Sequence, residues 1–458
     1  MSQCPHHPPK PPVRQGRAGF WRYLRLVRAD LLSAHPAKLY RAWMAAFRTP
    51  FFRSYLCNDP ALIDLVLKER PGDFPKSDRL REGLEPLLGQ SVFVTNGDQW
   101  AAQRRIIDPA FEGGRLRDVF PAIWAASLAM IDRLSARSRT ALDIEPEASH
   151  AAADVIFRTL FSIPIQDGLA AQVFDAFRRH QRAAPIVNLA ALLPLPRWLP
   201  RPHSRATRAT AAEIRALITR LTDDRMAAIR AGTAPDDLAT KIMTTPDPQT
   251  GRCFEAAEMV DQVAIFFLAG HETSASALAW ALWLLADSPE WQDRVADEAR
   301  REIGADTPDI GLIGRLPTAR AVFREALRLY PPVPMMVRQT TRPERLRDRD
   351  VAPGAQIVLS PWHLHRHERI WDDPDAFDPG RFATDNGREG LRRAFIPFSA
   401  GPRVCPGAGF AMIEGPLMLA LIARAFWIDT VPGRRPEPVA YLTVRGRDGI
   451  WLRLTPRA

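Results

Sequence analysis

Cysteine is scarce in this chain of 458 residues. Its four cysteines, Cys4, Cys57, Cys253 and Cys405, are scattered without a pairing pattern. This argues against a disulfide framework as a source of stability and favours a reducing compartment. Since no Cys-x-x-Cys pair and no His-Glu-x-x-His helix occurs, the sequence gives little support to a structural zinc site.

Long apolar runs are also missing. No stretch reaches about 18 uninterrupted apolar residues, so we expect no transmembrane helix. The proline-rich start, residues 1–19, lacks the apolar segment of a secretory signal, and we expect a disordered tail there. Together these features predict a cytoplasmic protein.

Lysine contributes only five of the 62 basic residues, against 52 acidic ones, so arginine carries most of the net charge of +10. Such a surface favours acidic partners or anionic membranes. Nucleic acid is not an expected partner, because no concentrated basic run is interleaved with aromatic residues. Residues 19–32 space aromatics and leucines among arginines at helical intervals. We expect a surface helix that packs on the body, and the alternative is a helix that lies on a membrane surface.

Hydrophobic residues are abundant, at 46% of the chain, which is enough for a large buried core. Helical patterns cover residues 118–182, 206–231 and 256–287. The last of these is apolar nearly all round, as expected of a helix through the middle of a large protein. Proline and β-branched residues dominate 331–360, and 441–456 alternates like a hairpin. The sequence therefore predicts a mainly α protein with a small β subdomain.

Two shorter segments have distinct patterns. Residues 96–111 begin with an Asn/Asp cluster and continue as a helix. Residues 192–204 form a proline-broken apolar stretch between helices, which predicts a surface loop or a lid.

The stretch FSAGPRVCPG, residues 398–407, surrounds one cysteine with glycines, a phenylalanine and an arginine. It fills every fixed position of the pattern Phe-x-x-Gly-x-Arg-x-Cys-x-Gly, and so resembles the haem-binding loop of the cytochrome P450 family. The resemblance implies that Cys405 binds the iron of heme b as a thiolate. The other implied cofactor contacts in this loop are Phe398, Gly401, Arg403 and Gly407.

Physical chemistry explains these residue types. A thiolate binds iron, so Cys405 must be held deprotonated, and backbone N–H groups of the loop and the next helix can point at its sulfur. Gly401 and Gly407 allow backbone geometry and a close approach that a Cβ would block. Phe398 can cover the sulfur side of the ring, and the charge of Arg403 suits a haem propionate.

The stretch AGHETS, residues 269–274, resembles the oxygen-activating segment of the same family. The resemblance implies catalytic roles for Glu272 and Thr273. The Thr273 hydroxyl can hold oxygen and a water and can also bond back to a carbonyl, while Glu272 can relay protons. Gly270 would leave room above the ring. The alternative is a polar break in a buried helix, and for His271 we favour a satisfied histidine over a titrating relay.

Three further matches complete the resemblance. WAAQR, residues 100–104, resembles the family's Trp-x-x-x-Arg helix and implies that Trp100 and Arg104, one turn apart, contact haem propionates. Arg338 stands where many members have another propionate arginine. EALR, residues 325–328, with the loop 371–382, implies a structural trio beneath the haem that consists of Glu325, Arg328 and Arg381. The alternative is an exposed salt bridge of little energetic value.

Alternating histidines occur at His363, His365 and His367. On a strand they would share one face and could bind a metal. The family, however, commonly has a His-Arg pair at this place, so we favour a structural role.

The resemblance covers about residues 40–456 and implies one P450 domain at 40–458, after an N-terminal tail and amphipathic segment at 1–39. It implies a haem-thiolate monooxygenase, most similar to bacterial members, that inserts one atom of O₂ into an apolar small molecule such as a fatty acid or terpenoid. Electrons would come from an external ferredoxin or flavodoxin with its reductase, since the chain ends just beyond its last strands. The implied substrate-pocket residues are Phe93, Leu268, Ala269, Val333, Met335 and Leu442.

Two alternatives remain at this point: a haem-thiolate isomerase or peroxygenase, and a non-catalytic haem sensor. Neither needs a proton relay, so the intact pair of Glu272 and Thr273 argues against both.

Overall fold

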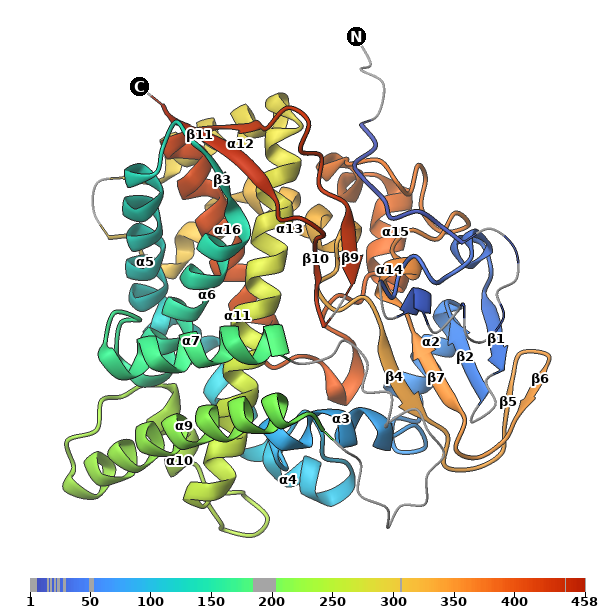
Figure 1. Ribbon diagram of the computed structural model, residues 1–458, viewed down its shortest axis with the longest axis horizontal. Coiled ribbons are helices and arrows are strands. Elements are labelled where there is room, and N and C mark those ends of the chain that lie inside the picture. Colours follow the sequence, from blue (N-terminus) through green and yellow to red (C-terminus); the bar gives the residue numbers. More distant parts are fainter. Residues whose placement is uncertain are drawn as a thin grey trace.

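The computed structural model describes residues 6–14, 16, 19, 22, 25–27, 30–48, 53–183, 203–304, 307–440 and 442–457. Most of these residues are helical, and the strands are short, as the sequence predicts. The helices surround one long central helix, α11 (Ala256–Ala286), while the largest sheet lies to one side of them (Figure 1).

The other helices are α2 (Pro60–Asp64), α3 (Asp78–Leu88), α4 (Gly97–Ile107), α5 (Gly113–Ala136), α6 (Ile144–Phe161), α7 (Gly168–Ala183), α9 (Arg205–Ala231), α10 (Leu238–Thr244), α12 (Pro289–Glu302), α13 (Pro317–Leu329), α14 (Pro361–Leu364), α15 (Asp385–Ala394) and α16 (Ala408–Ala425). Short 3₁₀ or π segments are η1 (Ala37–Tyr40), η2 (Leu65–Glu69), η3 (Asp108–Phe111), η4 (Ile310–Arg315), η5 (Pro379–Ala383) and η6 (Gly401–Arg403).

Helix α11 passes through the core because almost every face of it is apolar. It begins with a reciprocal capping box between Glu255 and Glu258, which satisfies backbone N–H groups of its first turn. Further along, Trp280 is fully buried and stacks on Tyr330 of the segment after α13, with ring centroids 3.9 Å apart. The helix packs against α6, α9, α13 and α16, so its side chains form the centre of the main hydrophobic core.

The largest sheet has four strands in the order β1 (Met44–Arg48), β2 (Arg53–Cys57), β7 (Gln356–Leu359) and β4 (Met336–Gln339). The pair of β2 and β7 is parallel, and the other two pairs are antiparallel. A second hydrophobic cluster packs on this sheet. Strands β5 (Glu344–Leu346) and β6 (Arg349–Val351) form a separate small ribbon.

The hairpin expected at 441–456 is not formed. Strand β10 (Val444–Gly446) pairs with β9 (Pro438–Ala440), whereas β11 (Trp451–Pro456) pairs with β8 (Phe426–Thr430) and β3 (Ala141–Asp143). The chain is redirected between β10 and β11 at Gly449, whose φ is +83°, and a Cβ on Gly446 would lie 2.6 Å from the Gly449 oxygen. The alternating pattern identified strands here, but it carried no information about their partners.

The N-terminal segment differs from the expected disordered tail, because residues 6–14 pack on the body. The hydroxyl of Tyr330 donates to the Pro9 oxygen at 2.6 Å, and Lys10 lies 2.8 Å from Asp375 and over the ring of Tyr40. The expected surface helix at 19–32 lies only partly within the described residues. Most of the expected loop or lid at 192–204 lies outside them.

Candidate active site

The loop around Cys405 joins η6 to α16, and its backbone geometry explains one of its glycines. Gly401 has a φ of +65°, and a Cβ there would lie 2.0 Å from the backbone oxygen of Leu67. The backbone N–H of Cys405 donates to the Phe398 oxygen at 2.9 Å, which closes the loop. A Cβ on Gly407 would make only an ordinary contact, 3.8 Å from the Cys405 sulfur. The steric argument therefore applies to Gly401 but not, within the protein itself, to Gly407.

The Cys405 side chain is accessible, although surrounding protein removes much of its hydration. This desolvation raises the pKa of the thiol, whereas the Gly407 N–H and the charge of Arg104 act in the opposite direction. A bound metal cation would favour the thiolate form of this side chain.

Four basic side chains gather beside this loop, and we call them the cation cluster: Lys76, Arg104, Arg338 and Arg403. The pKa of Lys76 is well below its usual range because of burial and the charges of the other three. Burial and the charge of Arg403 lower the pKa of Arg338 to about 10. Only Arg104 has a carboxylate partner, Asp108 at 2.7 Å; across the described residues the other three form no ion pair.

Buried charges without counter-charges are costly, so the cation cluster is complementary to an anion. The Nε atoms of Arg338 and Arg403 are buried and have no hydrogen-bond partner. Trp100 lies beside the cluster, with the Arg403 guanidinium 4.6 Å from its ring centroid. Together with the accessible Cys405, these residues fit a haem, whose two propionates would face the cations. Lys76 was not predicted, because no motif marks it and only the fold brings it here.

The predicted catalytic pair lies in the middle of α11. The hydroxyl of Thr273 donates to the Ala269 oxygen at 2.6 Å, which is the back-bond expected from the sequence. The side chain of Glu272 is buried, and its carboxylate lies 3.3 Å from Nη2 of Arg445 and 3.4 Å from the Thr443 hydroxyl. Arg445 and Thr443 belong to the chain around β10 and were not predicted.

The two residues between Ala269 and Glu272 face α6 and α7. A Cβ on Gly270 would lie 2.0 Å from Cδ1 of Ile156, so within the protein Gly270 makes room for α6. His271 is buried, and its Nδ1 donates to the Phe267 oxygen at 2.6 Å, which leaves Nε2 to accept from Gln181 at 3.0 Å. Burial lowers the pKa of His271, so it is a neutral, satisfied histidine.

The predicted pocket residues differ in their exposure. Of six large hydrophobic residues that are exposed in the described chain, three are predicted pocket residues: Phe93, Val333 and Leu442. Ala269 is also exposed, Met335 is partly buried, and Leu268 is buried at 6% exposure. Backbone contacts hold these segments around α11.

Two of these contacts come from α11 itself. Gln262 accepts from the Val92 N–H at 2.9 Å, and Ser276 donates to the Val444 oxygen at 2.6 Å. The Val444 N–H donates to the Pro332 oxygen at 3.0 Å, which ties the segment of Leu442 to that of Val333. The structure thus brings the three segments that carry Phe93, Val333 and Leu442 to one helix.

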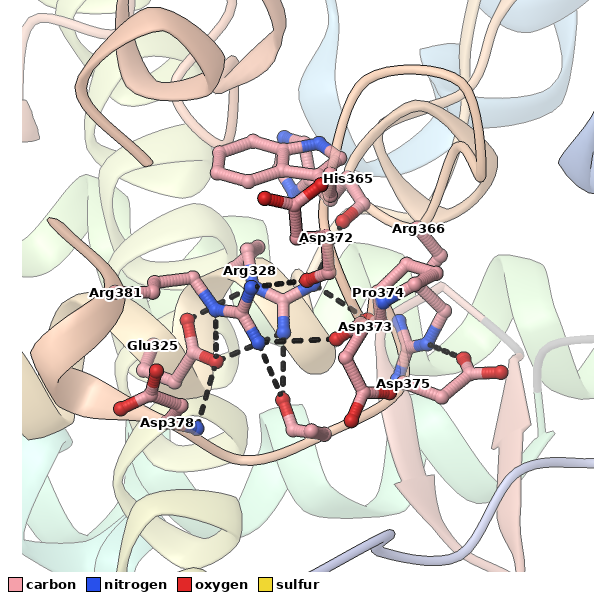
Figure 2. A network of polar contacts seen from close by, with 12 residues as sticks. Glu325, Arg328, His365, Arg366, Asp372, Asp373, Pro374, Asp375, Asp378 and Arg381 are labelled. Carbon is pink, nitrogen blue, oxygen red and sulfur yellow. Dashed lines mark hydrogen bonds and ion pairs between the residues drawn. The ribbon is translucent and has the colours of Figure 1, made fainter. Parts of the chain in front are cut away.

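The residues Glu325, Arg328 and Arg381, which we call the core trio, meet in a buried network (Figure 2). Arg328 donates to Glu325 through Nε and Nη2, both at 2.8 Å, and Arg381 donates through Nε at 2.9 Å. Arg328 also donates to the backbone oxygens of His365, Pro374 and Ala376. Burial alone would raise the pKa of Glu325, but the two arginines outweigh it and the pKa is lowered. The trio therefore joins α13 to the loop before η5.

Another buried carboxyl, that of Glu414 on α16, was not predicted. Burial raises its pKa to about 7, and the hydroxyl of Ser274 donates to it. The contact joins α16 to α11 one residue after Thr273. No local pattern could have identified it, because the two residues are 140 positions apart.

The three alternating histidines do not lie on a strand. His363 belongs to α14, and His365 and His367 follow it in a turn. All three are buried: His363 contacts Ser360, His365 accepts from the Ile396 N–H, and His367 stacks on Trp43. Among the described residues no group of histidine, cysteine, aspartate or glutamate side chains could hold a metal ion on its own.

Curated relatives match most of the chain. A cytokinin hydroxylase of Arabidopsis thaliana is 30% identical over 409 residues, which are 88% of this chain and 79% of the relative. Cytochrome P450 CYP72A616 of Paris polyphylla is 28% identical over 93% of this chain and 84% of its own. Cyclooctatin synthase of Streptomyces melanosporofaciens is 30% identical over 85% of this chain and 84% of its own.

Among solved structures, the haem domain of cytochrome P450DA superposes with a TM-score of 0.82 at 23% identity. The match covers 100% of this chain and 99% of the other. It confirms the fold that the sequence predicts.

The prediction of a cytoplasmic protein is wrong. It relied on the absence of long apolar runs, whereas the relatives of the plant CYP72 group are membrane-anchored proteins. Within the described residues, α5 and α16 are long and apolar enough to cross a membrane by length and composition, although 61% of the apolar part of α16 is buried in the protein.

A family model for cytochrome P450 matches residues 47–447. This range contains all the elements described above around Cys405, the cation cluster and the core trio. The match covers most of the chain, and relatives at 30% identity agree with it. The chain belongs to the cytochrome P450 family, and it is a haem-thiolate monooxygenase.

Proposed function

We propose that this monooxygenase oxidises an apolar small molecule, with Glu272 and Thr273 delivering protons and Cys405 as the thiolate ligand. The observation that carries the proposal is the position of the polar pair on α11, among wall segments that expose Phe93, Val333 and Leu442. Apolar walls with a few placed polar groups are typical of small-molecule sites.

The cofactor contacts of the proposal follow the predicted residues. Trp100 and the cation cluster would hold the propionates, and Phe398 and the two loop glycines would shape the cysteine side. A haem held by a cysteine ligand supplies the activation of O₂ and favours O–O cleavage.

The chain's own part in the reaction is to exclude water and to place protons. Thr273 keeps its hydroxyl oxygen as an acceptor, because its hydrogen bond to Ala269 uses only the proton. Glu272 is the acidic group next to it in sequence and connects to the chain around β10. We infer that protons reach the pocket through these two side chains.

The substrate class follows from the pocket walls, since none of the predicted pocket residues can anchor a charged group. Two relatives, by their names a cytokinin hydroxylase and a cyclooctatin synthase, support a small organic substrate. A fatty acid, terpenoid or similar apolar molecule fits these walls.

Electrons would come from a separate ferredoxin or flavodoxin with its reductase. Such carriers are usually acidic, and the net charge of +10 favours association with them. Reduction by a surrogate ferredoxin should therefore slow as salt is added, and a rate independent of salt would contradict this partner.

The substrate proposal is tested by a screen for compounds that shift the absorption band of the haem, followed by turnover with surrogate redox partners. We expect apolar compounds to shift the band and charged ones not to. Phe93→Asp should weaken the response to apolar compounds, whereas Leu128→Asp, an exposed apolar residue on α5, should not. Equal responses to both compound classes would refute the proposal.

The proton-delivery proposal has its own test. Thr273→Ala should keep consuming reductant while it releases peroxide, whereas Glu272→Gln should slow turnover by about a hundredfold. Product, peroxide and oxidised reductant are measured together, and the haem spectrum checks that the cofactor is in place. Wild-type coupling and rate in both variants would exclude the relay.

A further inference from the structure

Phe93 stands out among its neighbours because its ring is exposed in a buried segment. Phe93 is 40% exposed, whereas the two residues on each side of it in the sequence are each 9% exposed or less. The proposed function places this ring in the wall of the substrate pocket. The groups that fix its position would therefore affect which substrates the pocket accepts.

The residue before it, Val92, is held at both of its backbone groups by side chains from other segments. The Val92 N–H donates to Oε1 of Gln262 on α11 at 2.9 Å, and the Val92 oxygen accepts from Nζ of Lys76 at 2.6 Å. The same Nζ lies 5.9 Å from the centroid of the Phe93 ring. Since the N–H and the oxygen belong to the peptide groups before and after Val92, the two contacts set the direction in which the chain enters Phe93.

The Gln262 side chain has one polar contact among the described residues, which is the one to Val92. The residue is fully buried, and its Nε2 has no hydrogen-bond partner in the part of the chain that the structure describes. Gln262 also lies about two helical turns before Ala269 and about three before Thr273, so the three residues share one face of α11. The contact to Val92 thus starts from the helix face that carries Thr273 of the proposed catalytic pair.

Both ends of the segment are fixed independently of Gln262. The Gln90 N–H donates to Oδ2 of Asp261 at 2.7 Å, and the Gln90 oxygen accepts from Nε2 of Gln103 at 2.7 Å. Oε1 of Gln103 accepts from the Thr95 hydroxyl at 2.6 Å. A change at Gln262 should therefore release the middle of the segment without unfolding it.

We propose that Gln262 is a positioning residue that sets the place of the Phe93 ring in the pocket wall and so determines which apolar groups the pocket accepts. The inference rests on the proposed pocket. Without the Gln262 oxygen, the Val92 N–H would stay buried without an acceptor, which costs free energy. A turn or shift of this peptide group relieves the cost, and Phe93 moves with it because it is the next residue.

The first test uses two imidazoles that bind the haem iron through nitrogen and carry different apolar tails, one biphenylmethyl and one dodecyl. Absorption titrations of the haem-loaded protein give the ratio of the two affinities. A rigid aromatic tail needs a fixed ring to pack on, whereas a flexible chain can adapt. Gln262→Met should therefore reduce the preference for the biphenylmethyl tail by about three- to tenfold. Gln262→Glu keeps an acceptor oxygen for Val92 and should restore the wild-type ratio.

A double variant and a control separate positioning from a general loss of stability. Phe93→Ala should also reduce the preference, and adding Gln262→Met to it should change the ratio little further, because Gln262 acts through Phe93. The control is Gln292→Met, which removes a buried glutamine of α12 that bonds the N–H and the oxygen of Ile428. It should lower stability and leave the ratio unchanged. Additive effects in the double variant, or an equal change of the ratio in Gln292→Met, would overturn the inference.

The second test needs no added ligand. Amide hydrogen exchange of the haem-loaded protein should be faster at Val92 in Gln262→Met by at least about tenfold, and Gln262→Glu should restore the protection. The Gln90 N–H, which Asp261 holds, should keep its rate. Unchanged exchange at Val92 in Gln262→Met would show that the contact does not hold the segment.

The proposed pocket and this inference fail in different ways. If Phe93→Ala leaves the affinity ratio unchanged, the ring is not part of the pocket wall, and the proposed function is wrong on that point. If Phe93→Ala changes the ratio and Gln262→Met does not, only the positioning role of Gln262 is wrong.

Discussion

The core trio is a buried group of charges and the cation cluster is a partly buried one, yet only the core trio is complete. In the core trio, the Glu325 carboxylate accepts from two arginines, and both arginines use their remaining donors on backbone oxygens. In the cation cluster, Lys76, Arg338 and Arg403 face no carboxylate among the described residues, and two of their nitrogens have no partner.

The difference shows what each group is for. A complete set of buried charges can only be disturbed by a ligand, so it holds elements together, here α13 and the loop before η5. An incomplete set of one sign costs free energy until an anion arrives, so it is suited to binding. The haem propionates would complete the cation cluster as Glu325 completes the core trio.

The largest effect on the free energy of unfolding is expected from a substitution that breaks the core trio. Glu325→Ala leaves Arg328 and Arg381 buried without their carboxylate, which should lower the free energy of unfolding by about 3–5 kcal/mol. Denaturant unfolding and haem content measure it, and we expect protein without haem. Glu325→Gln, which keeps the shape but not the charge, is the matched variant and should also be destabilised. Normal haem content in Glu325→Ala would show that the trio is not needed for the fold beneath the haem.

The core trio and the cysteine loop were predictable because their chemistry is local in sequence. Glu325 and Arg328 are three residues apart on a helix, and Gly401 lies four residues before Cys405 in one loop. Arg381 is further away, but the resemblance of its own loop identified it. In such segments the interacting residues are close in sequence, so the family motif is enough to identify them.

The rest depended on contacts between distant elements. Lys76 joins the cation cluster and Glu414 meets Ser274 only because the fold brings separate segments together. The close contact between Gly270 and Ile156 on α6 is of the same kind, because it joins two distant segments. Periodicity predicts that a segment is helical and apolar, and it does not predict which segment it packs against.

Glu414 differs from Glu325, because its buried carboxyl has a hydroxyl and not a cation as its partner. Its pKa is raised from 4.5 to about 7, so folding favours the protonated form. The stability from this group is fully present below pH 4.5 and is lost as pH rises through 7. Between pH 5 and pH 8, wild type should therefore lose about 2–3 kcal/mol relative to Glu414→Gln. Unfolding curves at both pH values measure this difference, and parallel pH dependence of the two proteins would show that Glu414 is ionised throughout.

A substitution in the cation cluster should change the haem affinity more than the stability of the fold. Arg338→Met removes one of the cations that await an anion, so it should weaken haem binding by about 1.5–3 kcal/mol, or roughly 10- to 100-fold. Without haem, the free energy of unfolding of Arg338→Met should be no lower than that of the wild type, because the substitution removes a buried charge that has no partner. Haem transfer to an acceptor protein measures the first quantity, and Arg338→Lys, which keeps the charge, is the control. Equal haem affinity in Arg338→Met and wild type would contradict an anion-binding role.

The smallest effect is expected from a pair with the same spacing as Glu325 and Arg328 but without burial. Asp297 and Arg300 are also three residues apart on a helix, α12, and their charged atoms lie 3.0 Å apart. Their side chains are 63% and 42% exposed, so water and salt screen the pair and already solvate each partner. Arg300→Ala should therefore change the free energy of unfolding by less than about 0.5 kcal/mol, and haem content should be normal. The measurement is the same denaturant series that is used for Glu325→Ala, at low and high salt. A loss in Arg300→Ala comparable to that in Glu325→Ala would mean that spacing alone, and not burial with complete pairing, determines the value of such a pair.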